Sequence, residues 1–150
     1  MATNRLWRWV AIAAILLFFY LALDSMVGDS PTMDEQNHIA RGLAYLRTGD
    51  PRLSVEHPPL INVLSALPLL TMPQIELPLD DASWQRQPAD VFWYLFAEEF
   101  LWAANRDLDI QKILFLSRLP VVYLAIALSL VGWRFAQRLW GGLAPLLVLL

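Results

Sequence analysis

The sequence predicts an all-α membrane protein, a polytopic helical bundle, and three observations support that fold class. Hydrophobic residues make up 57% of the 150 residues, charged residues only 17%, and the mean hydropathy is +0.45, which is too apolar for an ordinary soluble domain. Two uncharged runs approach the ~20 residues that cross a bilayer core. Between them lies a polar segment, about 28–110, rich in acids, prolines and aromatic residues.

The overall charge and the cysteine content exclude several kinds of site. The chain has no cysteine, so it can form neither a disulfide framework nor a thiolate metal site. Its net charge is −3, whereas a nucleic-acid partner requires a basic surface. We therefore expect membrane lipid around the chain and no nucleic-acid partner.

The first spanning segment is predicted at about 8–27. Residues 9–23 are uncharged, and a snorkelling Arg8 lengthens the run at its start. Aromatic residues near both ends are typical of membrane interfaces. A cleaved signal peptide is the alternative, but Asp24 and the bulky Phe18-Phe19-Tyr20 sequence disfavour it because its cleavage site requires small residues.

The second spanning segment is predicted at about 111–133. Lys112 and Arg118 lie at its outer end, and Arg134 and Arg138 follow its inner end. Arginines without neighbouring acids also precede the first span, so the positive-inside rule places the N-terminus and the end of the second span in the cytoplasm. The loop between the spans is then exoplasmic, and a third span, truncated here, begins at about 139. We expect the N-terminal part of a longer, multi-pass protein of the cell membrane.

The most polar stretch of the exoplasmic loop has the signals of a helix start. Thr32 can cap the helix, and Glu35 three residues later completes a capping box. Ser30 is the alternative cap, with Pro31 at the first helical position. In either register, Asp34 and Glu35 lie in the first turn.

This helix is predicted to end at Thr48, because Gly49 favours a left-handed stop and Pro51 prevents continuation. Helical spacing divides its side chains between two faces. The apolar face comprises Ile39, Leu43 and Leu46. The polar face comprises Asp34, His38, Arg41 and Tyr45. Such a helix beside a span lies in the interface plane, so we expect the apolar face to contact lipid or protein and the polar face to be exposed to water.

Three further stretches complete the loop. Residues 60–72 are apolar but too short to span, so they should lie at the membrane surface or re-enter it. Residues 77–90 are predicted as an irregular loop. Residues 91–104 are predicted as an interfacial or buried aromatic helix with Glu98 and Glu99 on its exposed side, and packing explains its aromatic residues better than carbohydrate stacking does.

Four short motifs follow one another along the chain: Asp34-Glu35, Gly49-Asp50, His57-Pro58-Pro59-Leu60 and Ser117-Arg118-Leu119-Pro120. In this order, with spans on either side, they resemble the N-terminal region of the dolichyl-phosphate-mannose protein mannosyltransferase superfamily. These are polytopic GT-C glycosyltransferases, whose bacterial members include the lipid A aminoarabinose transferases. The resemblance extends from the first span to the third and implies a GT-C-like bundle.

The resemblance implies an inverting enzyme that transfers a sugar from a polyprenyl-phosphate donor to an acceptor at the exoplasmic face. Asp34 matches the catalytic base or acceptor-positioning carboxylate, and Glu35 would support it. The chain then reads Ile61-Asn62-Val63 where eukaryotic protein mannosyltransferases continue with Ala-Lys. The sugar therefore stays open, as does whether the acceptor is a protein, a lipid or a glycan.

The donor phosphate requires cations or hydrogen-bond donors around it. The candidate substrate-binding residues are Arg118, Arg41, Lys112, His57 and Tyr45. Structural alternatives exist for the main candidates: Arg118 can anchor a span at the headgroups, Arg41 can pair along its own helix, and Asp34 can stabilise the helix dipole.

No metal site is predicted. His38 and His57 do not form a zinc signature and suit hydrogen-bonding or structural roles better. A divalent ion on Asp34 or Glu56 stays open as a cofactor, without a motif to support it.

Two other functional classes compete with an enzyme. One is a transporter or permease fragment, but transporters place ionisable groups near the middle of their spans, and both apolar runs here are uncharged at their centres. The other is a non-enzymatic anchor or sensor with an exoplasmic acidic loop.

Overall fold

The computed structural model describes residues 2–54, 58–85 and 92–149, and every regular element in these ranges is helical. The chain divides into two compact units: unit 1 is Met1–Val27 with Val122–Leu150, and unit 2 is Gly28–Val121. Among the described residues, two helices are long and apolar enough to cross a membrane. The predicted all-α class is therefore confirmed.

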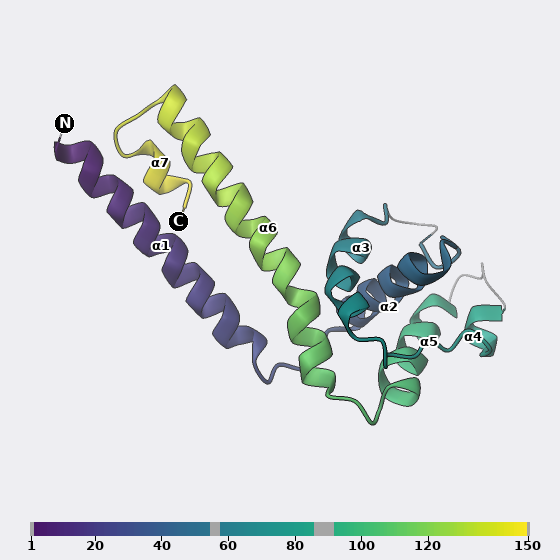
Figure 1. Cartoon of the computed structure of the whole chain (residues 1–150). Coiled ribbons are helices and arrows are strands. Elements are labelled where there is room, and N and C mark those ends of the chain that lie inside the picture. Colours follow the sequence, from purple (N-terminus) through teal and green to yellow (C-terminus); the bar gives the residue numbers. More distant parts are fainter. Residues whose placement is uncertain (1, 55–57, 86–91, 150) are drawn as a thin grey trace. The chain divides into compact units, whose positions relative to one another are not determined.

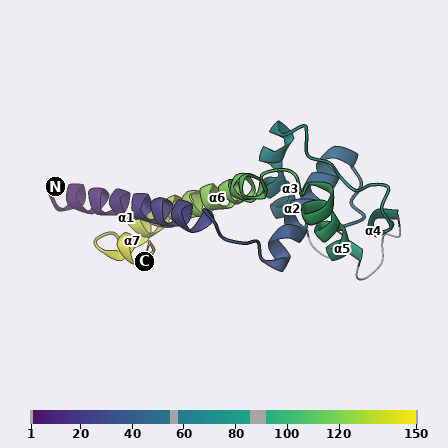
Figure 2. The same cartoon turned by 90° about the horizontal axis from the view of Figure 1, so that it is seen from below.

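Unit 1 contains α1 (Ala2–Met26), the C-terminal part of α6 (Ile110–Leu139) and α7 (Ala144–Leu147). In Figures 1 and 2, α1 and this part of α6 lie side by side and run in opposite directions. The ring of Phe19 stacks on that of Tyr123, with centroids 6.2 Å apart. Most apolar side chains of both helices are exposed, which is expected of helices that meet lipid or further helices.

The end of unit 1 differs from the prediction. Helix α6 continues to Leu139, beyond the predicted limit of 133, and α7 is a single turn within the stretch predicted to begin a truncated third span at about 139. The chain turns between them at Gly141 and Gly142, whose φ angles of 64° and 54° lie in the left-handed region that glycine adopts without strain.

Unit 2 is built around α2 (Met33–Thr48), and helices α3 and α5 both pack against it (Figures 1 and 2). Its other elements are α3 (Leu60–Ala66), the 3₁₀ helix η1 (Leu67–Thr71), α4 (Ala82–Gln85), α5 (Phe92–Glu98), the π-helical η2 (Glu99–Ala104) and the start of α6. The predicted loop 77–90 thus contains a helical turn, and the stretch predicted as one helix over 91–104 becomes π-helical after Glu98. Residues 86–91, where these two predictions meet, lie outside the described residues.

Both ends of α2 match the sequence signals. The Thr32 hydroxyl accepts a hydrogen bond from the backbone N–H of Glu35 (3.3 Å), and the Thr32 N–H donates to a Glu35 carboxylate oxygen (3.4 Å). Gly49 adopts a φ of 72° and donates its N–H to the carbonyl of Tyr45 (2.8 Å). The capping box with Thr32 as cap and the glycine stop are confirmed, because both depend on residues within a few positions of each other.

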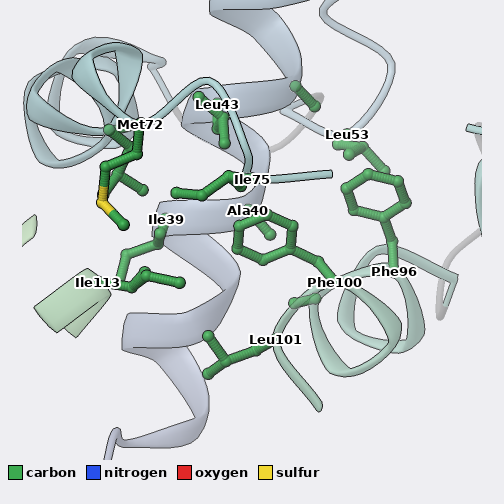
Figure 3. Packing of buried hydrophobic residues seen from close by; sticks show 14 of the residues in the cluster. Ile39, Ala40, Leu43, Leu53, Met72, Ile75, Phe96, Phe100, Leu101 and Ile113 are labelled. Carbon is green, nitrogen blue, oxygen red and sulfur yellow. The ribbon is translucent and has the colours of Figure 1, made fainter. Parts of the chain in front are cut away.

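The apolar face of α2 packs on protein. Ile39 and Leu43 are fully buried in one hydrophobic cluster with Phe96 and Phe100 from α5 and η2 and with Ile113 from α6 (Figure 3). Glu98 and Glu99 on the opposite side of that aromatic segment are exposed, as predicted. Each fully buried side chain of this size stabilises the fold by about 1.5–3 kcal/mol, so this cluster fixes how α2 is held.

Helix α3 approaches α2 unusually closely at Gly42. A Cβ atom added to Gly42 would lie 1.8 Å from the backbone carbonyl oxygen of Asn62 and 2.9 Å from the Cβ of Ala66. Only a glycine leaves room for backbone at this distance. The contact fixes Asn62, which is 1% exposed, against the polar side of α2.

Candidate functional site

The predicted catalytic residues lie where α2 begins, and the structure gives them different surroundings. Asp34 is exposed in the first helical turn. Glu35 forms an ion pair with Arg118 of α6, with Nε 2.6 Å from Oε1 and Nη2 2.9 Å from Oε2. The two side chains are only 22% and 15% exposed. Such a bidentate, partly shielded pair is stronger and more directional than a surface ion pair.

Arg118 also joins the chain that leads into α2. Its Nη1 and Nη2 atoms donate to the carbonyl of Asp29 (both 3.3 Å), and Nη2 donates to that of Ser30 (3.4 Å). The Arg118 guanidinium thereby ties α6 both to the segment before α2 and to the first turn of α2. No ion pair among the described residues involves Asp34, so it is the solvent-facing carboxylate of the Asp34–Glu35 pair.

One turn further along the same face, His38 takes part in a partly buried polar network. Its Nδ1 lies 2.7 Å from the amide oxygen of Asn62, and the Asn62 amide nitrogen donates to the hydroxyl of Ser54 at 3.3 Å. An amide oxygen can only accept, so in neutral His38 the proton is on Nδ1 and Nε2 keeps a free lone pair. His38 is half-buried, and its ring is held between α2 and α3.

The prediction that the whole polar face of α2 is exposed to water is wrong at Arg41. This residue is only 4% exposed, and its guanidinium carbon lies 4.0 Å from the centroid of the Trp93 ring. The aromatic segment that follows residue 91 covers this side of α2, and the face of an indole ring attracts a cation. Tyr45, one turn later, is half-buried.

Two of the remaining substrate-binding candidates, Lys112 and Tyr45, make no described contact with the Glu35–Arg118 pair. Lys112 is exposed in the first turn of α6, where its backbone N–H binds the carboxylate of Asp109 at 3.0 Å. His57, and Glu56 beside it, lie outside the described residues.

The described ranges contain no group of three or more His, Asp or Glu side chains placed to hold a metal ion. The structure therefore offers a carboxylate, an imidazole and a braced guanidinium around one end of a helix. This set can accept a proton, accept hydrogen bonds and orient a hydroxyl.

Asn62 and Ser54 join His38 in this network, although neither is among the residues predicted from the sequence. A signal was present: Asn62 is an isolated amide in an otherwise apolar, uncharged stretch, and a buried amide needs hydrogen-bond partners. Its partner His38 lies 24 positions away, which no local pattern reveals. In comparisons with known proteins, no family model, no curated protein and no solved structure matches the chain.

Proposed function

We propose that this chain is part of an inverting membrane glycosyltransferase that transfers a sugar from a polyprenyl-phosphate donor to an acceptor at the exoplasmic face. The start of α2 supports this best, because the ion pair of Glu35 with Arg118 leaves the adjacent Asp34 as an exposed carboxylate. The order of the four sequence motifs supports the same reaction.

In this proposal α1 and α6 are the first two spans of a multi-pass, GT-C-like bundle in the cell membrane. The N-terminus and the arginine-rich end of α6 are cytoplasmic, and unit 2 is the exoplasmic loop. The donor reaches the site from the lipid phase with its phosphate at the headgroup level. The acceptor is a protein, a lipid or a glycan.

The chemistry requires one base. The acceptor oxygen attacks the anomeric carbon and loses its proton, while the bond between that carbon and the phosphate oxygen breaks. The electron pair of that bond leaves with polyprenyl phosphate, which needs little protonation because phosphate is a good leaving group. Asp34 takes the proton from the acceptor, and the attack from the opposite side inverts the configuration.

The surroundings of Asp34 suit this role. Its carboxylate is exposed in the first turn of α2, so an acceptor hydroxyl can reach it. The charge of Glu35 is offset by Arg118, so the negative potential that attracts a hydroxyl is concentrated on Asp34. Glu35 and Arg118 act as positioning residues that hold the first turn in place.

The donor phosphate must be met by other groups as well, since most N–H groups of Arg118 already contact Glu35 and backbone carbonyls. Lys112 is exposed and suits a phosphate as a point charge. The other candidates for phosphate binding are still Arg41, Tyr45 and His57. The positive charge of Arg41 would act on the phosphate from its position against the Trp93 ring.

The test is transfer from radiolabelled polyprenyl-phosphate sugars in membranes that contain the protein, with and without a chelator to decide whether a divalent ion takes part. We expect Asp34→Asn to lose at least about a hundredfold in rate, the usual contribution of a positioned base, while the protein stays folded and in the membrane. Asp107→Asn is the matched control, because this carboxylate is 93% exposed and far along the chain.

Full activity of Asp34→Asn would remove Asp34 from the mechanism. If the unmodified protein transfers no sugar from any donor but carries a solute across vesicle membranes, a transporter replaces the enzyme. If it does neither, the non-enzymatic anchor is the better interpretation.

A further inference from the structure

Helix α3 and the following η1 bury two polar side chains and expose several large aliphatic ones. The residues turned toward the protein include Asn62 and Ser65, which are 1% and 6% exposed, together with the fully buried Ala66 and Leu69. The residues turned outward are large and aliphatic: Leu60 is 64% exposed, Leu67 49% and Leu70 46%. A segment in water would place its leucines inside and its amide outside.

Contacts with α2 fix this orientation. The amide of Asn62 binds both His38 and Ser54, and its backbone fits against Gly42. Turning the helix to bury the leucines would break both hydrogen bonds and open this contact. The exposed aliphatic side chains, here called the α3 strip, are those of Leu60, Ile61, Leu67 and Leu70.

The composition of the strip points to lipid. No charged residue occurs from Pro58 to Ile75. The strip has only aliphatic side chains, whereas the centres of protein interfaces favour aromatic residues and arginine. Large aliphatic side chains exposed together on one short segment mark an interaction surface, and these have the chemistry of acyl chains.

Unit 2 is joined to both candidate spans by short connections. Gly28 follows α1 almost directly, and α6 leaves unit 2 at Val121 without interruption. Both neighbouring helices are long and apolar enough to cross a bilayer. Residues 60–71 are too short to cross it themselves, since a helix of this length reaches only about 20 Å and the hydrocarbon core is about 30 Å thick.

We propose that the α3 strip lies in the plane of the outer leaflet, with its leucines among the upper acyl-chain segments, to a depth of about 5–10 Å. This proposal rests on the membrane placement given above and not on sugar transfer. It selects the surface position over re-entry. Because Asn62 and Gly42 lock α3 onto α2, the depth of α3 also sets the height of Asp34, close to where a lipid-borne phosphate would lie.

The absence of cysteine allows a clean test. Single Leu60→Cys, Leu67→Cys and Leu70→Cys variants, spin-labelled and reconstituted without substrate in phosphatidylethanolamine–phosphatidylglycerol vesicles, are compared by their collisions with oxygen and with a water-soluble nickel complex. Glu98→Cys and Asp107→Cys are controls at exposed, charged positions of the same unit. We expect the strip labels to be open to oxygen and at least about fivefold less open to nickel than the controls, as acyl-chain depth requires.

Strip labels as open to nickel as the controls would overturn the proposal, and so would labels shielded from both probes, because a protein segment would then cover the strip. As a second measurement, a fluorophore at Leu67→Cys should be quenched by lipids brominated in the upper acyl chain, and one at Asp107→Cys should not. The result of this test does not change the result of the transfer assay. If the protein transfers no sugar but its strip labels are open to oxygen and shielded from nickel, the proposed enzyme is rejected and the lipid contact is retained.

Discussion

Arg118 meets the carboxylate of Glu35 through two hydrogen bonds of 2.6 and 2.9 Å, although the two residues are 83 positions apart. The same carboxylate accepts the N–H of Thr32 and so completes the cap of α2. One side chain therefore both starts this helix and attaches it to α6. The first turn, with Asp34 in it, is held from outside as well as by its own cap.

The ion pair and the cap can be separated by Glu35→Gln. Glutamine retains an oxygen for the capping box but loses the charge that meets Arg118, so we expect the free energy of unfolding to fall by about 1–2 kcal/mol, between the values for surface and buried pairs. Thermal unfolding in detergent measures this, with the exposed Glu98→Gln as control, which should change it by less than about 0.5 kcal/mol.

A double-mutant cycle then isolates the pair itself. Arg118→Gln alone should cost more than Glu35→Gln, because Arg118 also holds the carbonyls of Asp29 and Ser30. Once Glu35 is neutral, the additional loss from Arg118→Gln should shrink by about 1 kcal/mol. Strictly additive losses would mean that the two charges do not stabilise each other.

Gly42→Ala tests the close approach of α2 and α3. In an open helix this change stabilises by up to about 1 kcal/mol, but here the new Cβ would meet the Asn62 carbonyl oxygen at 1.8 Å. Backbone cannot move aside cheaply, so we expect a loss of about 3 kcal/mol or more. The measurement is thermal unfolding of the reconstituted protein.

The matched control is Gly132→Ala in α6, where the new Cβ would meet only a methyl group of Val148, at 2.8 Å. A side-chain end can shift, so this variant should lose much less. If Gly42→Ala is as stable as the control, α2 and α3 do not approach each other this closely at Gly42.

The sequence could predict what depends on neighbouring residues. The capping box of Thr32 and Glu35, the stop at Gly49 and the burial of Ile39 and Leu43 follow from local chemistry and helical spacing, and the structure bears them out. The two span-length helices follow from composition and length in the same way.

Contacts between distant segments could not be predicted in this way. The residues around Arg118 in the sequence do not indicate that Glu35 is its partner. The residues around Arg41 likewise do not indicate that Trp93 covers Arg41. The amphipathic pattern of α2 predicts one buried face and one face exposed to water. The aromatic helix that packs on the polar face buries Arg41 as well. The composition of residues 60–72 predicts an apolar helical segment. The side that this segment turns toward the protein depends on the buried amide of Asn62, which no local pattern reveals.

Asn105 offers a test of buried polar satisfaction. It is 1% exposed, its amide nitrogen donates to the carbonyls of Glu76 (2.8 Å) and Phe100 (2.7 Å), and its oxygen accepts the N–H of Glu76 (2.8 Å). Asn105→Ala removes all three hydrogen bonds, of which the one to Phe100 is buried and the two to Glu76 are partly buried, and should cost about 2–4 kcal/mol in thermal unfolding.

Asn105→Asp should be worse than alanine at pH 7, because a carboxylate oxygen would face two carbonyl oxygens. At pH 4 the gap between the two variants should narrow, since a protonated aspartate regains a donor. An aspartate variant as stable as the unmodified protein at pH 7 would contradict the amide orientation on which this prediction depends.

Asp50 gives the last prediction, which concerns pH. The Arg52 side chain donates to the Asp50 carboxylate (Nε to Oδ2, 2.8 Å) and so does the Arg52 backbone N–H (2.9 Å), and these hydrogen bonds hold the pKa of Asp50 below its ordinary value of about 3.9. A carboxyl group whose pKa is lower in the folded state stabilises that state above the unfolded pKa, and the stabilisation is lost as the pH falls through the folded pKa.

The unfolding temperature of the protein should therefore exceed that of Asp50→Asn from pH 7 down to about pH 5, and the difference should disappear as the pH falls below about 3. Asp80→Asn, at an exposed aspartate close by on the chain, should follow the unmodified protein. A difference for Asp50→Asn that persists undiminished at pH 2 would show that the hydrogen bonds from Arg52 do not depend on the charge of Asp50.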